Sequence, residues 1–368
     1  MEANQSVDYT DMLSICPQAL ETYQQRGVND VIAAYDIGNI LITNHFYGEA
    51  AFFYKLAFNM HSKNPSEHPL NHVLWMIRMV ALLKGGFPLK DEDMEQLRSL
   101  SLPFYNYVTG WKQYKDNHDA LSAVLTMGNC YEEFPTGEGA DRTYLSIMMD
   151  LFNGNPHLSV IGRTYHNSMI QVIPNNLFMY WDDEVSEDRS NFEYHQQLGY
   201  FNCKIFSKTE AVDWLYQNYG IEARQIFLSL NSLVEAEDFL RVHVINQYGG
   251  WWLGRGLRIK SIEQFCSVLP TMYEHVFFLA DIDVVHNDFF GSVANSPILN
   301  ECIRSLYHNC YVNPDLFPTY KTGPGIFNRA VNRTLYRCLK GQGQRPSMIV
   351  LKHQDFWWQV IETSHPAQ

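Results

Sequence analysis

The sequence predicts a two-domain protein in which an all-α domain, residues 1–155, precedes an α/β domain, residues 156–368. Three observations lead to this prediction. The chain of 368 residues is long enough for two domains. Apolar residues recur at helical spacing up to about residue 150. After the segment NGNPHLS, short apolar runs alternate with helical segments, which is typical of a largely parallel sheet flanked by helices.

The best-defined part of the first domain is a pair of helices between residues 30 and 65. Its sequence is DVIAAYDIGNILITNHFYGEAAFFYKLAFNMHSKNP, and the two helical segments join near His45-Phe46. Large side chains alternate with small residues that let two helices approach closely, at Ala34, Gly38, Ala50 and Ala57. This arrangement resembles a tetratricopeptide repeat (TPR), and Met127-Gly128-Asn129 partly repeats Ile37-Gly38-Asn39. We therefore expect a short TPR-like array of helical pairs, with a plain helical bundle as the alternative.

The strands of the second domain are expected at three apolar runs. These are NLFMYW (176–181), GGWWL (249–253) and HVFFLA (275–280). Helices are expected over residues 209–220 and 236–249. Ligands of such sheets bind at the carboxyl ends of parallel strands, so the segments MYWDD and WWLGRG form the candidate site. The two tryptophans of GGWWL are expected to pack in the core.

Composition and charge exclude several classes of function. A net charge of −13 argues against nucleic acid or an anionic membrane as the main partner. No apolar run reaches the roughly eighteen residues of a membrane span. The polar residues after Met1 do not form a signal peptide, so a cytoplasmic location is expected. The seven scattered cysteines contain no C-x-x-C pair, which predicts reduced thiols rather than a zinc site or a disulfide framework.

The helix expected over residues 236–249 carries the first candidate site residues. Asp238 and Arg241 are three residues apart and therefore share one face of this helix. The simple alternative is an exposed ion pair within the helix. The helix ends at Gly249-Gly250 and a strand follows at once, leading to Gly254-Arg255-Gly256. Asp238 and Arg241 are therefore expected near this tip.

The order A-x-D-x-x-R followed by Y-G-G-aromatic-aromatic-Leu resembles the donor-binding region of the DXD-containing glycosyltransferases. These form the family-32-like group, which is related to the glucosylating clostridial toxins. Other segments are similar to further blocks of that family, in the same order, over roughly residues 170–358: IPNNLFMYWDDEV, FSKTEAVDWLYQNYG, NDFFGSVANSPIL, KTGPGIFNRAV and KHQDFWW. The resemblance implies a GT-A fold, which is a Rossmann-like nucleotide-sugar domain.

The resemblance also implies an activity and the residues that serve it. The second domain would bind a nucleoside diphosphate sugar, a UDP- or GDP-hexose, and transfer the hexose with retention of configuration. Trp181 would stack on the base, Asp238 would accept hydrogen bonds from sugar hydroxyls, and Arg241 would hold the sugar or phosphate. Asn287 and Trp358 would complete the donor site. A protein or glycan acceptor is expected to bind through the helical repeats.

The chain departs from the family at the motif that gives the family its name. An Asp-x-Asp pair holds Mn²⁺ or Mg²⁺, which neutralises the diphosphate as the sugar leaves. Gly254 and Gly256 stand at these two positions and supply no side-chain oxygen. One explanation is that catalysis has been lost. The chain would then be a pseudo-glycosyltransferase that acts as a binding or scaffold protein through its helical domain.

Two further explanations keep the enzyme active. Arg255, followed closely by Arg258 and Lys260, could replace the metal by binding phosphate oxygens directly, because a guanidinium forks onto such oxygens. Alternatively, Asp281 and Asp283 follow the strand expected at 275–280, share one face, and could form a displaced metal site.

Overall fold

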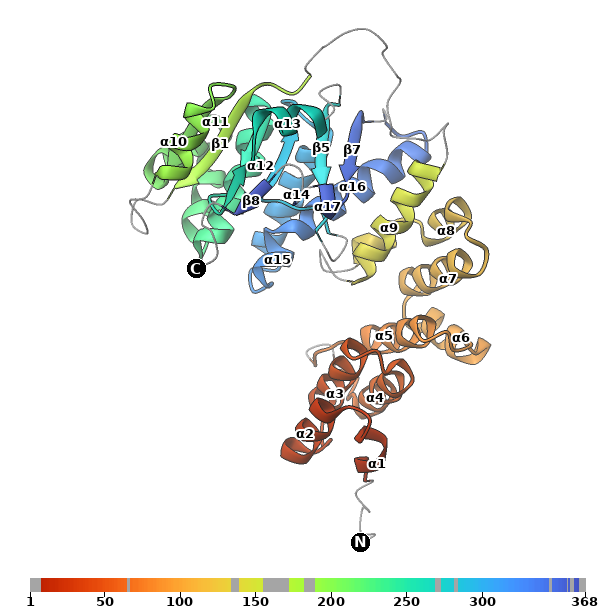
Figure 1. Ribbon diagram of the computed structural model, residues 1–368. Helices are drawn as coiled ribbons and strands as arrows, with labels where there is room; N and C mark the ends of the chain where they lie inside the picture. The colour runs from red at the N-terminus through yellow and green to blue at the C-terminus, as the bar shows by residue number, and fades with distance from the viewer. Residues whose placement is uncertain are drawn as a thin grey trace. The chain divides into compact units, whose positions relative to one another are not determined.

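The computed structural model describes residues 8–64, 67–133, 139–154, 172–181, 189–268, 273–280, 284–343, 346–355, 357 and 361–363. The chain divides into two compact units, Met1–Cys130 and Tyr131–Gln368 (Figure 1). Helix α9 (Gly139–Gly154) belongs to the second unit, where it packs on α16 (Pro324–Leu339). The boundary expected after residue 155 lies at the edge of the undescribed segment 155–171.

The first unit is helical in all the secondary structure that its described residues form. Its helices are α1 (Thr10–Leu13), α2 (Pro17–Arg26), α3 (Val31–Thr43), α4 (Tyr47–Met60), α5 (Asn71–Lys84), α6 (Asp91–Leu100), α7 (Leu102–Asn117) and α8 (Ala120–Met127). The predicted pair of helices joined near His45-Phe46 is present as α3 and α4. The 3-10 helix η1 (Cys130–Glu133) spans the division between the units.

Close packing of α3 on α4 depends on a small residue, as the sequence predicts. Asp30 caps α3, because its side chain accepts a hydrogen bond from the backbone N–H of Ala33. A Cβ at Gly38 would lie 2.6 Å from the ring of Tyr54, so only glycine allows this approach. The Tyr54 hydroxyl then donates to Oδ1 of Asn39 at 3.0 Å.

The second glycine of the apparent repeat has a different role. Gly128 ends α8 with a φ of 62°, whereas Gly38 lies inside α3. The close approach between α7 and α8 is made at Gly110 instead, where a Cβ would lie 2.6 Å from the side chain of Met127. The similarity between the two short sequences therefore does not reflect equivalent positions in two helical pairs.

The second unit has the predicted α/β character. In the described residues, one six-stranded sheet has the order β2-β1-β3-β6-β5-β7, and a second sheet has two strands, β4-β8. The strands are β1 (Asn176–Trp181), β2 (Asn202–Ser207), β3 (Gly250–Leu253), β4 (Leu257–Ile259), β5 (His275–Phe278), β6 (Phe289–Ser292), β7 (Met348–Leu351) and β8 (Ile361–Thr363). In the larger sheet β6 runs antiparallel to both its neighbours, while the other pairings keep one direction.

Helices flank this sheet (Figure 1). Besides α9 and α16 they are α10 (Ser190–Gln197), α11 (Lys208–Ser229), α12 (Leu233–Tyr248), α13 (Ile262–Val268), α14 (Pro297–Val312), α15 (Pro318–Lys321) and α17 (His353–Asp355). Helix α12 packs on β1, β3 and β6, and α14 packs on α12 and α16. None of the helices in the described residues combines the length and the apolar character needed to cross a bilayer.

Strand β3 is buried on both faces, which explains its continuous apolar sequence. Trp251 lies in the apolar cluster on one side, stacked on Phe289. Trp252 faces the other side, where its indole N–H donates to Oε1 of Glu237 on α12 at 3.3 Å. Both tryptophans are core residues, as predicted.

The carboxyl ends of the parallel strands meet at one edge of the sheet. Strand β1 ends there at Trp181 and β3 ends there at Leu253. The antiparallel strand β6 begins at the same edge, because Phe289 is the register partner of Leu253. Asn287 and Asp288, immediately before β6, are therefore brought beside the tip that follows β3.

Candidate functional site at the carboxyl edge of the sheet

Helix α12 and strand β3 are joined by a turn that only glycine can form. The helix ends at Gly249 with a φ of 64°, and Gly250 follows with a φ of 122°. Other residues rarely adopt such values, and a Cβ at Gly250 would lie 2.6 Å from the carbonyl oxygen of Asn176. The turn holds the start of β3 tightly against β1, so that β3 leads directly to the edge.

The guanidinium of Arg241 is at the centre of the site and contacts three carboxylates among the described residues. Its Nη2 lies 3.3 Å from Oε1 of Glu237 and 3.2 Å from Oδ1 of Asp238. Its Nη1 donates to Oδ1 of Asp288 at 2.8 Å. The side chains of Arg241 and Asp238 are 1% and 2% exposed. The simple alternative of an exposed ion pair is therefore wrong, because this face of α12 packs against the sheet.

Both carboxylate oxygens of Asp238 accept hydrogen bonds. Oδ1 accepts from the side-chain amide of Asn287 at 2.7 Å, and Oδ2 accepts from the hydroxyl of Thr322 at 3.0 Å. Burial raises the pKa of Asp238 to about 7, even though the charge of Arg241 acts in the opposite direction. Asp238 therefore titrates near neutral pH. Its hydrogen bonds also link α12 to two segments that are distant in sequence.

Asp288 is the member of this network that reaches solvent, and sequence reasoning missed it. Its side chain is 48% exposed, in contrast to the buried carboxylates of α12. Its backbone oxygen accepts from the N–H of Gly254 at 2.7 Å. Burial acts to raise the pKa of Asp288, but the charges of Arg241 and His286 and the hydrogen bond from Arg241 together outweigh burial, so the pKa is lowered. A sequence signal did exist, since Asp288 directly follows the candidate residue Asn287.

Glu237 is a second residue that sequence reasoning missed. Burial raises its pKa, while the charges of Arg241 and, more weakly, Arg255 act in the opposite direction. The guanidinium carbon of Arg241 lies 5.8 Å from the ring centroid of Trp252, which bonds to Glu237. Glu237 was passed over because the motif A-x-D-x-x-R treats its position as variable.

The two glycines of the tip Gly254-Arg255-Gly256 have different surroundings. A Cβ at Gly254 would lie 3.1 Å from the Cβ of Asp288, whereas nothing lies within 4 Å of one at Gly256. Arg255 is exposed. The two basic residues that follow are engaged elsewhere: Arg258 stacks over Tyr194 at 4.4 Å, and Lys260 donates to the backbone oxygen of Trp357 at 2.6 Å. Arg255 lies at the tip itself, and its charge acts on the pKa of Glu237.

Trp181 ends β1 and is partly buried. Its strand pairs in parallel with β3, with Phe178 opposite Trp252, so that Trp181 and the tip at Gly254 follow the same direction to the same edge. The other residues expected at the site, Trp358, Asp281 and Asp283, lie outside the described residues.

A divalent cation has no fitting set of ligands in the described part of the chain. No cluster of three or more His, Cys, Asp or Glu side chains there could hold a metal ion. The three carboxylates around Arg241 do not fit Mn²⁺ or Mg²⁺, because the guanidinium already occupies the position between them. Gly254 and Gly256 add only backbone atoms.

Comparison with known proteins finds similarity among solved structures only, and it is weak. No protein-family model matches the chain, and no curated protein matches it. Among solved structures, the chain is similar to one described as the PaToxG glycosyltransferase, with 14% identity and a TM-score of 0.36. The match covers 55% of this chain and 88% of the other. A TM-score this low does not establish a shared fold, so function is inferred from the residues of this chain.

Proposed function

We propose that the second unit binds a nucleoside diphosphate sugar, a UDP- or GDP-hexose, at the carboxyl edge of its sheet and transfers the hexose to an acceptor with retention of configuration. The observation that carries this proposal is the network around Arg241. It draws residues of α12, of the segment before β6 and of the segment before α16 to one edge of the sheet. A GT-A fold for this unit and TPR-like pairing in the first unit are part of the proposal.

The sequence blocks that resemble the DXD-containing glycosyltransferases include the residues of this network. Asp238 and Arg241 come from the block that precedes the tip, and Asn287 and Asp288 open a later block. Thr322 lies in the block KTGPGIFNRAV. The resemblance gives only the order of these blocks along the chain. The hydrogen bonds of Asp238 connect them in space.

A donor would first meet the charged groups that reach solvent, Asp288 and Arg255. Asp238 and Arg241 are buried, so a direct contact between Arg241 and the donor requires the ligand to displace Asp288 from Nη1. A diphosphate in that position would gain a charge-assisted guanidinium contact, and Arg255 would add a second positive charge. Positive side chains would then stabilise the leaving diphosphate.

The proposed chemical step is the one that the family resemblance implies. The bond between the anomeric carbon and the diphosphate oxygen breaks. The acceptor oxygen then bonds to that carbon from the same face, and its proton passes to the departing diphosphate. Trp181 would position the donor by stacking on the base. Asn287, held by Asp238, would orient a sugar or phosphate oxygen through its amide.

The rival function is that of a non-catalytic binding protein. The observations that favour it are the absence of side-chain oxygens at Gly254 and Gly256 and the burial of Asp238 and Arg241 against each other. In that case the edge of the sheet would bind nucleotide without turnover. The first unit would recruit a protein or glycan, because helical repeats build concave recognition surfaces.

Titration calorimetry and a hydrolysis assay with UDP-glucose and GDP-mannose test the proposal. We expect binding that weakens in Trp181→Ala and Arg255→Gln but not in Arg98→Gln, a control on the exposed surface of the first unit. Turnover that survives a chelator and falls in Arg255→Gln would support replacement of the metal by arginine. Turnover that is lost with chelator and in Asp283→Ala would support a displaced metal site.

The remaining outcomes separate the rival function from failure of the whole proposal. Binding without turnover, with or without Mn²⁺, would identify a pseudo-glycosyltransferase. If neither donor binds, or if a donor binds and Trp181→Ala and Arg255→Gln leave its affinity unchanged, then the edge of the sheet is not a nucleotide-sugar site.

A further inference from the structure

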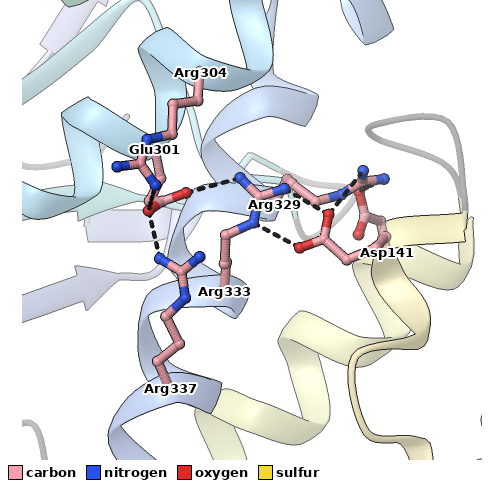
Figure 2. A network of polar contacts seen from close by, with 7 residues as sticks. Asp141, Glu301, Arg304, Arg329, Arg333 and Arg337 are labelled. Carbon is pink, nitrogen blue, oxygen red and sulfur yellow. Dashed lines mark hydrogen bonds and ion pairs between the residues drawn. The ribbon is translucent and has the colours of Figure 1, made fainter. Parts of the chain in front are cut away.

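A second charged cluster lies between α14 and α16, apart from the residues of the candidate site. Arg329, Arg333 and Arg337 follow each other at intervals of four residues and therefore share one face of α16. Arg304 of α14 joins them, and Figure 2 shows Glu301 between Arg304 and Arg337. Like charges at this spacing destabilise a helix unless other groups compensate them. The cluster therefore requires an explanation.

The carboxylates of the cluster compensate the arginines only in part: among the residues that the structure describes, four arginines face three carboxylates, Glu132, Glu301 and Asp141, the last 3.5 Å from Arg329. In the described residues, Glu301 accepts from Arg304 at 3.0 Å, from Arg333 at 2.9 Å and from Arg337 at 2.5 Å. Glu132 forms a fork–fork pair with Arg333, with bonds of 2.6 and 2.5 Å. Hydrogen bonds from Arg337 and Arg333 lower the pKa of Glu301 although its burial acts to raise it.

These side chains line a cavity of about 470 Å³. Four arginines contribute to its lining, against two carboxylates, Glu132 and Glu301, in the described residues. Ser305, His308 and Asn309 of α14 add polar groups to the same wall. The volume is within the range of small-molecule sites, and the excess of positive charge contrasts with a net charge of −13 for the whole chain.

The two most exposed guanidiniums have capacity for a further acceptor. The side chains of Arg304 and Arg337 are 69% and 43% exposed, and the hydrogen bond that each makes to Glu301 uses a single nitrogen, Nη1. A guanidinium carries five N–H donors in a planar fork that matches phosphate oxygens. An ion pair that an exposed arginine makes through a single nitrogen contributes little to stability. Stabilising the contact between α14 and α16 therefore does not explain why these arginines are gathered here.

We propose that the cavity between α14 and α16 binds the phosphate group of a small anionic ligand, with Arg304 and Arg337 as its direct contacts. Arg333 is held from two sides by Glu132 and Glu301, so it fixes the position of Glu301 between the other arginines. The concave shape selects a small ligand over an extended polyanion such as nucleic acid. The phosphate group can belong to a free inorganic anion or to a nucleotide, and the recognition chemistry is the same for both.

Titration calorimetry with inorganic pyrophosphate, using the full chain, tests this site. The variant is Arg304→Gln combined with Arg337→Gln. The matched control is Arg98→Gln, because Arg98 is also an exposed arginine paired with a glutamate three residues before it. We expect at least about tenfold weaker binding in the double variant, since hydrogen bonds to charged groups are the strong ones. Unchanged affinity is expected for the control.

A second comparison separates this site from the edge of the sheet. In the Arg255→Gln background, where binding at the edge is weakened, pyrophosphate affinity should still fall when Arg304→Gln and Arg337→Gln are added. Loss of all pyrophosphate binding in Arg255→Gln alone would place the anion at the edge and not in the cavity. Replacing pyrophosphate by UDP or GDP distinguishes the two sources of the phosphate. If UDP or GDP binds and its affinity falls in the double variant, the ligand of the cavity is a nucleotide. If pyrophosphate binds and neither nucleotide does, the ligand is a free anion.

Thermal unfolding keeps the test valid if the double variant is less stable. Each protein is compared with itself, with and without pyrophosphate, and a ligand that binds only the folded state raises the unfolding temperature. We expect a clear increase for wild type and Arg98→Gln and a smaller one for the double variant, which retains only the edge of the sheet as a diphosphate site. No binding to wild type, or equal binding and equal increases in wild type and the double variant, would overturn the proposal.

Discussion

The second unit contains two charge networks of opposite arrangement: in one an arginine is surrounded by carboxylates, and in the other a glutamate is surrounded by arginines. At the edge of the sheet, Arg241 contacts three carboxylates; between α14 and α16, Glu301 accepts from three guanidiniums, counting described residues in both cases. The first network buries its centre and two of its carboxylates. The second leaves Arg304 and Arg337 exposed.

The comparison shows how each network handles its excess charge. An excess of carboxylates can be removed by protonation, and burial raises the pKa of Asp238 to about 7 and raises that of Glu237 as well. An excess of guanidiniums cannot be removed in this way, because arginine keeps its proton at any ordinary pH. Positive charge around Glu301 must therefore stay near solvent or meet an anion, whereas negative charge around Arg241 can be buried.

Removing the centre of the first network should have the largest effect. We expect Arg241→Met to reduce the free energy of unfolding at neutral pH by about 3–5 kcal/mol, because Glu237 and Asp238 lose their buried partner. Urea denaturation measures this loss, and part of it should be recovered on acidification as the carboxylates protonate. A loss below about 1 kcal/mol would mean that Arg241 contributes far less than its burial indicates.

Removing the centre of the second network should have a smaller effect. Glu301→Gln is expected to reduce the free energy of unfolding by about 1–3 kcal/mol, since the arginines it leaves are partly hydrated. The same variant should bind pyrophosphate more tightly than wild type, because it removes negative charge from the cavity. Weaker binding measured by calorimetry would mean that Glu301 holds the arginines in position for the anion, and that this effect exceeds its repulsion of the anion.

The pH dependence of stability should have opposite signs in the two networks. The folded pKa of Asp238 is about 7 against an ordinary value of 3.8, so its contribution is fully present below about pH 4 and is lost as pH rises towards 7. The pKa of Glu301 is lowered from 4.5, so its contribution is present above that value and is lost on further acidification.

Urea denaturation across this range tests the sign. Asp238→Asn should flatten the decrease in stability between about pH 4 and about pH 7, and Glu301→Gln should leave the slope in that window unchanged. Equal slopes in wild type and Asp238→Asn would show that Asp238 does not titrate near neutral pH.

The smallest effects are expected at the tip, where they test the position of Asp288 in the first network. Gly254→Ala should cost about 1 kcal/mol, because the new methyl group would press on the Cβ of Asp288 at 3.1 Å. Gly256→Ala meets open space and should stay within about 0.5 kcal/mol of wild type. Thermal unfolding of the two variants side by side makes the comparison. Equal effects would mean that Asp288 moves aside freely.

The α/β character of the second half was predictable because burial of β3 on both faces leaves a clear trace in its sequence. Five consecutive positions of GGWWL carry no charge, and the glycines before the tryptophans predict the sharp turn after α12. The pairing of α3 with α4 was predictable for a similar reason, since Gly38 meets Tyr54 at a distance that excludes any side chain. Close packing restricts residue size, and residue size is visible in a sequence.

The candidate site was only partly predictable. Asp238 and Arg241 are placed together by helical spacing, but their burial depends on Trp252 and on the packing of α12. Asp288 is not marked by the pattern of polar residues that follow parallel strands. It precedes a strand instead, and only the reversed direction of β6 brings it to the edge. Strand direction is set by long-range pairing, which no local pattern reveals.

Position 254 and Asp288 compete for the same space beside Arg241. A Cβ at position 254 would lie 3.1 Å from the Cβ of Asp288, so a side chain there fits only if Asp288 shifts by a few tenths of an ångström. Relatives of this chain that carry an aspartate at position 254 should therefore have a smaller residue at position 288.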